Sequence, residues 1–191
     1  MEVKRLFDII TNYLEKYPGK TDALAAKENE QWVTYDIKTF AENVNMVSYG
    51  LLLLGLKKGD KIATLSNNRP EWNFLDLGML QLGCVHVPIY PTISETDLKF
   101  ILTDAEIKMV VVSDELLWDK IQPSIQGLAL KAVFMFNQIA GKPNWMDIVN
   151  AGRMQPQEAL LNNIKQSIQP DDLATLLYTS GTIVTTHNLP Y

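Results

Sequence analysis

A short turn near the end of the chain carries the residue types best suited to chemistry. Residues 173–178 form an apolar run interrupted only by Thr175, and the turn follows this run directly. The turn consists of Thr179, Ser180, Gly181 and Thr182. Hydroxyl side chains and a glycine allow O–H and backbone N–H groups to converge on one anion, such as the β- and γ-phosphates of a nucleotide. The same four residues could make an ordinary surface turn, and the apolar strand before them is what favours phosphate binding.

Composition limits the classes of protein to which the chain can belong. Its 191 residues are 47% hydrophobic and 20% charged, so they are sufficient for a packed core and give no sign of disorder. The formal net charge of -5 argues against a nucleic-acid binder, which usually presents a basic face. We therefore expect no nucleic-acid partner.

The cellular compartment of the protein can be inferred from its cysteine content and its N-terminal sequence. Cys84 is the only cysteine, which excludes a disulfide framework and a four-cysteine zinc site and fits a reducing cytosol. Asp8, Asn12 and Glu15 interrupt the apolar positions of the N-terminus, so this segment does not resemble a signal peptide. The apolar run at residues 51–54 is too short to span a bilayer. These features predict a cytoplasmic protein.

Stretches with helical and strand-like spacing alternate along the chain. Helical spacing marks residues 6–17, 37–54, 70–82, 94–103, 115–125 and 159–168. Strand-like runs occupy residues 23–26, 32–34, 62–65, 84–87, 109–112, 132–136 and 173–178, the first two as a hairpin. Strands separated by helices need crossover connections, which predicts an α/β fold with a largely parallel sheet flanked by helices.

Four local features predict helix caps, a loop region and a buried strand. Thr34 is a candidate cap for the helix that follows it, and Ser94 with Asp97 has the spacing of a capping box. Residues 137–157 are polar and contain proline, which predicts mostly loop with short helices. The largely apolar character of residues 173–178 predicts a buried strand.

The turn and several upstream segments resemble a known family. Residues 178–182 match the first half of Y-T-S-G-T-T-G-x-P-K-G, the phosphate-loop signature of the adenylate-forming (AMP-binding) superfamily. Residues 66–72 and 83–92 resemble the S-x-N-R-P-E-W and G-A-V-x-V-P-I-Y-P-T elements of its long-chain fatty acid–CoA ligase (acyl-CoA synthetase) branch. The similarity covers nearly the whole chain and is weakest between residues 122 and 169.

The second half of the loop departs from the family pattern. Read in register, Ile183, Val184, Thr186 and His187 replace the expected Thr, Gly, Pro and Lys. Read with a gap, residues 183–188 match the segment that follows the loop, and His187 falls on the family's post-loop histidine. We favour the gap, which makes His187 a candidate pocket residue. In both readings the phosphate-binding lysine is absent, by deletion or because it is left out of this sequence, and its loss should weaken triphosphate binding.

The resemblance implies a two-step reaction. A fatty acid carboxylate attacks the α-phosphate of ATP, and the thiol of coenzyme A then displaces AMP, with Mg2+ assisting at the phosphates. Thr179, Ser180, Gly181 and Thr182 would contact the phosphates. Residues 1–191 would form the N-terminal portion of an AMP-binding domain whose C-terminal part is absent. On this view the chain holds no catalytic residue and no metal ligand, and it is inactive alone.

The resemblance leaves membrane association, oligomeric state and one alternative function open. The family assignment allows peripheral association with the inner membrane surface and leaves the oligomeric state undetermined. The alternative function is a non-catalytic truncated module that binds a partner or a nucleotide. Among the other polar candidates, Arg69 is better explained as a scaffold ion pair, His86 as a packed histidine and Cys84 as a core residue.

Overall fold

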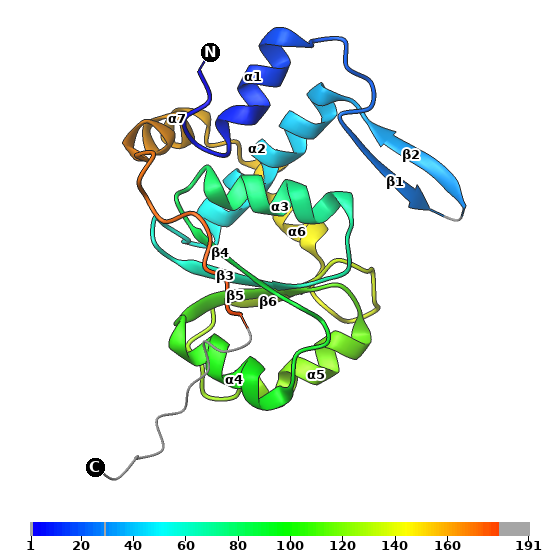
Figure 1. The fold of residues 1–191 in the computed structure, drawn as a ribbon, viewed down its shortest axis with the longest axis vertical. Coiled ribbons are helices and arrows are strands. Elements are labelled where there is room, and N and C mark those ends of the chain that lie inside the picture. Colours follow the sequence, from blue (N-terminus) through cyan, green and yellow to red (C-terminus); the bar gives the residue numbers. More distant parts are fainter. Residues whose placement is uncertain (1, 29, 180–191) are drawn as a thin grey trace.

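The computed structural model describes residues 2–28 and 30–179, and it alternates helices and strands as the sequence predicts (Figure 1). Its elements in chain order are α1 (Asp8–Lys16), β1 (Leu24–Glu28), β2 (Gln31–Tyr35), α2 (Ile37–Leu53), β3 (Lys61–Leu65), α3 (Pro70–Leu80), β4 (Val85–Ile89), α4 (Glu95–Asp104), β5 (Ile107–Val112), α5 (Glu115–Ile125), β6 (Ala132–Met135), α6 (Trp145–Met154) and α7 (Glu158–Ser167).

The main sheet is parallel, which confirms the predicted fold class. Its strand order is β4-β3-β5-β6, and every neighbouring pair in it runs parallel. The crossovers between these strands are helical, as parallel pairing requires. The predicted hairpin is confirmed separately, because β1 and β2 pair antiparallel as a two-stranded sheet.

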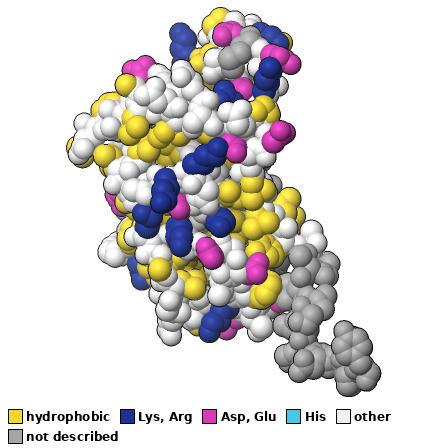
Figure 2. Space-filling model, turned by 90° about the vertical axis from the view of Figure 1, so that its left-hand side faces the viewer, with side chains coloured by type: hydrophobic (Ala, Val, Ile, Leu, Met, Phe, Trp, Pro, Cys, Tyr) yellow, Lys and Arg dark blue, Asp and Glu magenta, His cyan; other side chains and the backbone are white. Residues whose placement is uncertain are grey.

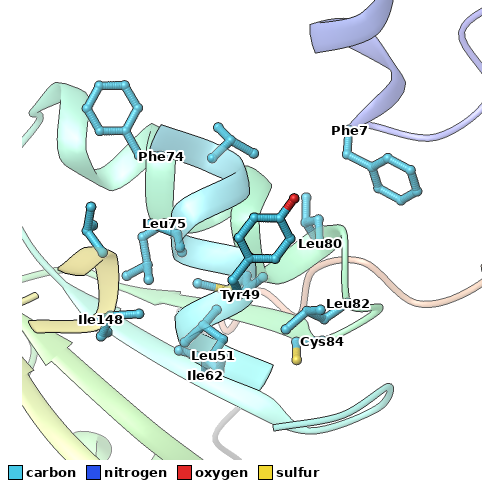
Figure 3. Packing of buried hydrophobic residues seen from close by; sticks show 14 of the residues in the cluster. Phe7, Tyr49, Leu51, Ile62, Phe74, Leu75, Leu80, Leu82, Cys84 and Ile148 are labelled. Atoms are coloured by element: carbon cyan, nitrogen blue, oxygen red, sulfur yellow. The ribbon is translucent and has the colours of Figure 1, made fainter. Parts of the chain in front are cut away.

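Helices cover both faces of the main sheet. In Figure 1, α2, α3 and α6 lie on one face, while α4 and α5 lie on the other. Side chains of β3 alternate between the two cores: Ile62 packs with the α2, α3 and α6 side, whereas Ala63 and Leu65 pack with the α4 and α5 side. Figure 3 shows the first core, where Ile62 lies with apolar side chains of α2, α3 and α6 such as Leu51, Leu75 and Ile148.

Two glycines allow α2 and α6 to pack backbone against backbone. A β-carbon on Gly50 of α2 would lie 2.0 Å from the carbonyl oxygen of Ile148. A β-carbon on Gly152 of α6 would lie 2.0 Å from the carbonyl oxygen of Met46. No side chain larger than hydrogen fits at either position without moving the helices apart.

The helix caps agree only in part with the sequence predictions. Ser94 accepts a hydrogen bond from the backbone N–H of Asp97, as predicted for α4. The prediction of Thr34 as a cap is wrong, because Asp36 caps α2 and accepts from the N–H of Thr39 at 2.7 Å. Thr34 instead belongs to β2.

Two segments differ from their predicted structure. For residues 137–157 the sequence predicts only short helices, but they contain a ten-residue helix, α6, which a capping box between Asn144 and Asp147 begins. Residues 173–178 are extended beside β4, but Leu173 and Leu177 are 57% and 65% exposed, so the prediction of a buried strand is wrong. This segment pairs with β4 on one side, and in the part of the chain that the structure describes no strand covers its other side.

Candidate functional site

The candidate site lies where β3, β4 and residues 173–178 end at the same edge of the sheet. The chain leaves β3 towards α3 on one face and leaves β4 towards α4 on the other face (Figure 1). Adjacent parallel strands whose connections diverge in this way leave a crevice at their carboxyl ends, which is where open α/β sheets bind ligands. The extended segment adds its own end to this edge, since Thr175 forms a parallel bridge with His86 of β4.

Two pockets that share the residues at the end of β4 occupy this edge. The first has a volume of about 200 Å³ and is lined by Thr64, Ser66, Asn68, Trp72, Pro88, Ile89, Tyr90, Pro91 and Leu177. The second has a volume of about 250 Å³ and is lined by Pro88, Ile89, Tyr90, Thr92, Ile93, Asp97, Ile101, Tyr178 and Thr179. Hydroxyl, amide and aromatic groups therefore meet at the point where the predicted phosphate loop begins.

Of the four residues predicted to bind phosphate, the structure describes Thr179. It is exposed and lines the second pocket. Ser180, Gly181, Thr182 and His187 lie outside the described residues. The location of Thr179 agrees with a loop that starts at the carboxyl edge of the sheet.

Tyr178 ties the start of the loop to α4. Its hydroxyl donates to Asp104 Oδ2 at 2.6 Å, and its ring meets that of Phe100 edge-on, with centroids 6.3 Å apart. Burial, together with the hydrogen bond to the Asp104 carboxylate and its charge, raises the pKa of Tyr178 to about 12. The phenol therefore stays protonated as a donor at neutral pH.

A chain of hydrogen bonds behind the first pocket joins β3, β4 and α3. Trp72 Nε1 donates to Thr64 Oγ1 at 3.0 Å, and Thr64 Oγ1 lies 2.8 Å from His86 Nε2. His86 Nδ1 lies 2.7 Å from Asp76 Oδ1. The packed character predicted for His86 is confirmed, since it is 1% exposed, but the sequence did not reveal its partners Thr64 and Asp76.

Arg69, at the start of α3, is an ion-pair residue as predicted. Its guanidinium donates two hydrogen bonds to Glu71, at 2.9 and 3.0 Å, and a third to Asn137 Oδ1 at 2.9 Å. Its Cζ atom also lies over the ring of Phe136, 4.9 Å from the ring centre. Burial acts to raise the pKa of Glu71, but the hydrogen bonds from Arg69, a backbone N–H hydrogen bond and the charge of Arg69 together outweigh it and lower the pKa. Arg69 thus fastens the loop after β6 to the beginning of α3.

A third pocket lies away from the predicted loop. Its volume is about 210 Å³, and it forms at the opposite, amino-terminal edge of the sheet, where Gly83 and Cys84 precede β4. Cys84 is fully buried, and burial followed by the charge of Asp60 raises the pKa of its thiol to about 12. This confirms Cys84 as a core residue and argues against a nucleophile there.

The surface carries charges of both signs. Figure 2 shows several Lys and Arg side chains together near the middle of one face, with acidic side chains among them and hydrophobic side chains beside them.

Within residues 2–28 and 30–179, His, Cys, Asp and Glu form no group of three or more that could hold a metal ion. Over the same residues, no helix has the length and apolar composition to cross a bilayer.

Two long-chain-fatty-acid–CoA ligases align with most of this chain. The long-chain-fatty-acid–CoA ligase ACSBG2 of Xenopus laevis is 31% identical over 186 residues, which cover 94% of this chain and 24% of that protein. The long-chain-fatty-acid–CoA ligase FadD15 of Mycobacterium tuberculosis is 31% identical over 155 residues, which cover 79% of this chain and 25% of that protein. The chain thus spans about a quarter of the length of these relatives.

Solved structures share the fold. The long-chain-fatty-acid–CoA ligase FadD1 from Archaeoglobus fulgidus matches with a TM-score of 0.72 and 19% identity, covering 93% of this chain and 34% of that one. VinN matches with a TM-score of 0.68 and 20% identity, covering 94% and 41% of the two chains. The model of the AMP-binding enzyme family matches residues 11–183. This chain therefore belongs to the AMP-binding enzyme family.

Proposed function

We propose that the chain is the N-terminal portion of an ATP-dependent long-chain fatty acid–CoA ligase and provides the first half of its phosphate loop. The observation that carries this proposal is the family match over residues 11–183, which includes the whole Thr-Ser-Gly-Thr turn. The names of the relatives support a fatty acid and coenzyme A as the other substrates.

The geometry supports the same assignment of the loop. Thr179 is exposed at the carboxyl edge of the sheet, beside pockets lined by hydroxyl, amide and aromatic groups. Backbone N–H groups and hydroxyls of Thr179, Ser180, Gly181 and Thr182 would hold the β- and γ-phosphates, which carry the charge that builds up as pyrophosphate leaves. His187 would lie near the nucleotide and the acyl chain.

In this proposal the chain contributes binding and orientation, and the rest of the active site comes from elsewhere in the enzyme. Magnesium, when bound, would neutralise charge on the phosphates. The chain by itself is then inactive, because the phosphate-binding lysine is absent from it. The protein acts in the cytoplasm, with peripheral contact to the inner membrane surface as the route to its fatty acid.

A chimera tests the proposed function. Residues 1–182 of this chain would replace the matching part of M. tuberculosis FadD15, which supplies the remaining residues. We expect palmitate-dependent release of pyrophosphate from the chimera and none from the chain alone. A Thr179→Ala/Ser180→Ala double variant of the chimera should lose most of that release and keep its circular dichroism spectrum. A folded chimera without palmitate-dependent activity would contradict the proposal.

A further inference from the structure

His86 connects the segment that leads to the loop with the body of the sheet. Its backbone N–H donates to the carbonyl oxygen of Ala174 at 2.9 Å, and its own carbonyl oxygen accepts from the N–H of Leu176 at 2.8 Å. These two bonds form the parallel bridge between β4 and the extended segment. The segment has no strand on its other side among the described residues, so the backbone hydrogen bonds that join it to the sheet are the two at His86.

The side chain of His86 is held at both ring nitrogens. An ionised Asp76 carboxylate only accepts, so His86 Nδ1, 2.7 Å from Asp76 Oδ1, carries a proton and donates. In the neutral ring Nε2 is then an acceptor, and it takes the hydroxyl proton of Thr64 at 2.8 Å. Thr64 Oγ1 accepts in turn from Trp72 Nε1. The three hydrogen bonds therefore run in one direction, from Trp72 through Thr64 and His86 to Asp76.

This chain of bonds is buried and joins three elements. Thr64 and His86 are each 1% exposed, and the Asp76 side chain is 20% exposed. The indole of Trp72 also lies against the imidazole, with ring centres 4.9 Å apart. A buried polar group that loses its partner is destabilised, so the orientation of the His86 ring, and with it the local backbone of β4, is tightly fixed.

We propose that His86 is a positioning residue for the phosphate loop. Its side chain is locked by Asp76 and Thr64, and its backbone fixes the register of the segment that leads to Thr179. The importance of that register for ATP rests on the proposed function, whereas the positioning itself is a property of the chain without ligand. Thr64 and Asp76 act through His86 and need no contact with the nucleotide.

Backbone amide exchange in the ligand-free chain tests the proposal. Thr64→Val keeps the side-chain shape but removes the hydroxyl, which leaves His86 Nε2 and Trp72 Nε1 without their partner. We expect exchange at the Leu176 and His86 amides to accelerate at least roughly tenfold, equivalent to about 1.4 kcal/mol. Exchange of the Phe136 amide, which is bonded to Val112 at the far side of the sheet, should change little. Thr64→Ser, which retains a hydroxyl, should restore protection.

A second readout examines the ring itself. Long-range proton–nitrogen NMR spectra of the native chain should show the neutral His86 ring with its proton on Nδ1 and none on Nε2. The proposal is overturned if the proton resides on Nε2, if Thr64→Val leaves the Leu176 amide protected, or if protection falls equally at Phe136. Neither measurement involves a nucleotide, so these results stand apart from a failure of the phosphate-loop assignment itself.

Discussion

The Tyr178 hydroxyl donates a 2.6 Å hydrogen bond to Asp104, which links the residue before the predicted phosphate loop to the last residue of α4. The raised pKa of Tyr178, about 12 against the usual 10.0, determines how this link responds to pH. Because the folded pKa lies above the unfolded one, the protonated phenol stabilises the fold fully below about pH 10. That contribution is lost as pH rises through about 12.

An absorbance titration of tyrosinate tests this relationship. The difference between the native chain and Tyr178→Phe should show one tyrosine with a midpoint near 12. Asp104→Asn should lower that midpoint, because it removes the carboxylate and leaves burial as the remaining cause. Asp119→Asn, which changes an exposed carboxylate on α5, serves as the matched control and should not move it. A native midpoint near 10 would show that the link does not form.

The close packing of α2 against α6 predicts that replacing a glycine by alanine destabilises the fold, which is the opposite of the usual effect within a helix. Alanine normally stabilises a helix relative to glycine by about 1 kcal/mol. Gly152→Ala should instead lower the free energy of unfolding by about 3 kcal/mol or more, because its β-carbon would meet the Met46 carbonyl at 2.0 Å. Urea denaturation of the variant measures this change.

Gly19→Ala is the control for that measurement, since no heavy atom beyond Gly19 and its two chain neighbours lies within 4 Å of the position that its β-carbon would take. Gly19→Ala should change the free energy of unfolding by much less than Gly152→Ala does. A neutral or stabilising Gly152→Ala would mean that the two helices are farther apart than the structure places them.

The thiol of Cys84 should be unreactive in the folded protein. Burial raises the pKa of its thiol to about 12, and its Sγ lies 3.4 Å from the carbonyl oxygen of Lys57. The thiolate is the reactive form, so a disulfide reagent near pH 8 should not label the native chain. The denatured chain should react with one equivalent. Rapid labelling under native conditions would show that this part of the core opens.

Residue patterns predicted most of the fold because helix and strand spacing is a local property. The spacing located the central strands and their helices, and Ser94 with Asp97 identified the start of α4. The same logic could have found α6: Asn144 and Asp147 form a capping box, and Ile148, Val149 and Gly152 follow at helical spacing. The polar, proline-containing surroundings of residues 137–157 obscured that signal.

The burial of residues 173–178 could not be predicted in the same way. An apolar run looks identical whether its strand lies inside a sheet or at its edge, and the difference depends on which neighbours are present. The partners of His86 were hidden for a related reason. Thr64 and Asp76 are 22 and 10 residues away, and only the register of β3 against β4 and the placement of α3 bring them to its ring.

In the proposed function, nucleotide phosphates bind at the turn that begins with Thr179. Calorimetric titration of magnesium–ATP into the chain, and into a form with Gly-x-Pro-Lys-Gly inserted after Thr182, tests it most directly. A charge-assisted hydrogen bond contributes about 1.5–3 kcal/mol, so the inserted form should bind roughly ten- to a hundredfold more tightly. A matched insertion with alanine in place of the lysine controls for loop length and should not reproduce that gain. Equal affinity in all three forms, or tight binding by the chain without the insertion, would show that the phosphate site lies elsewhere.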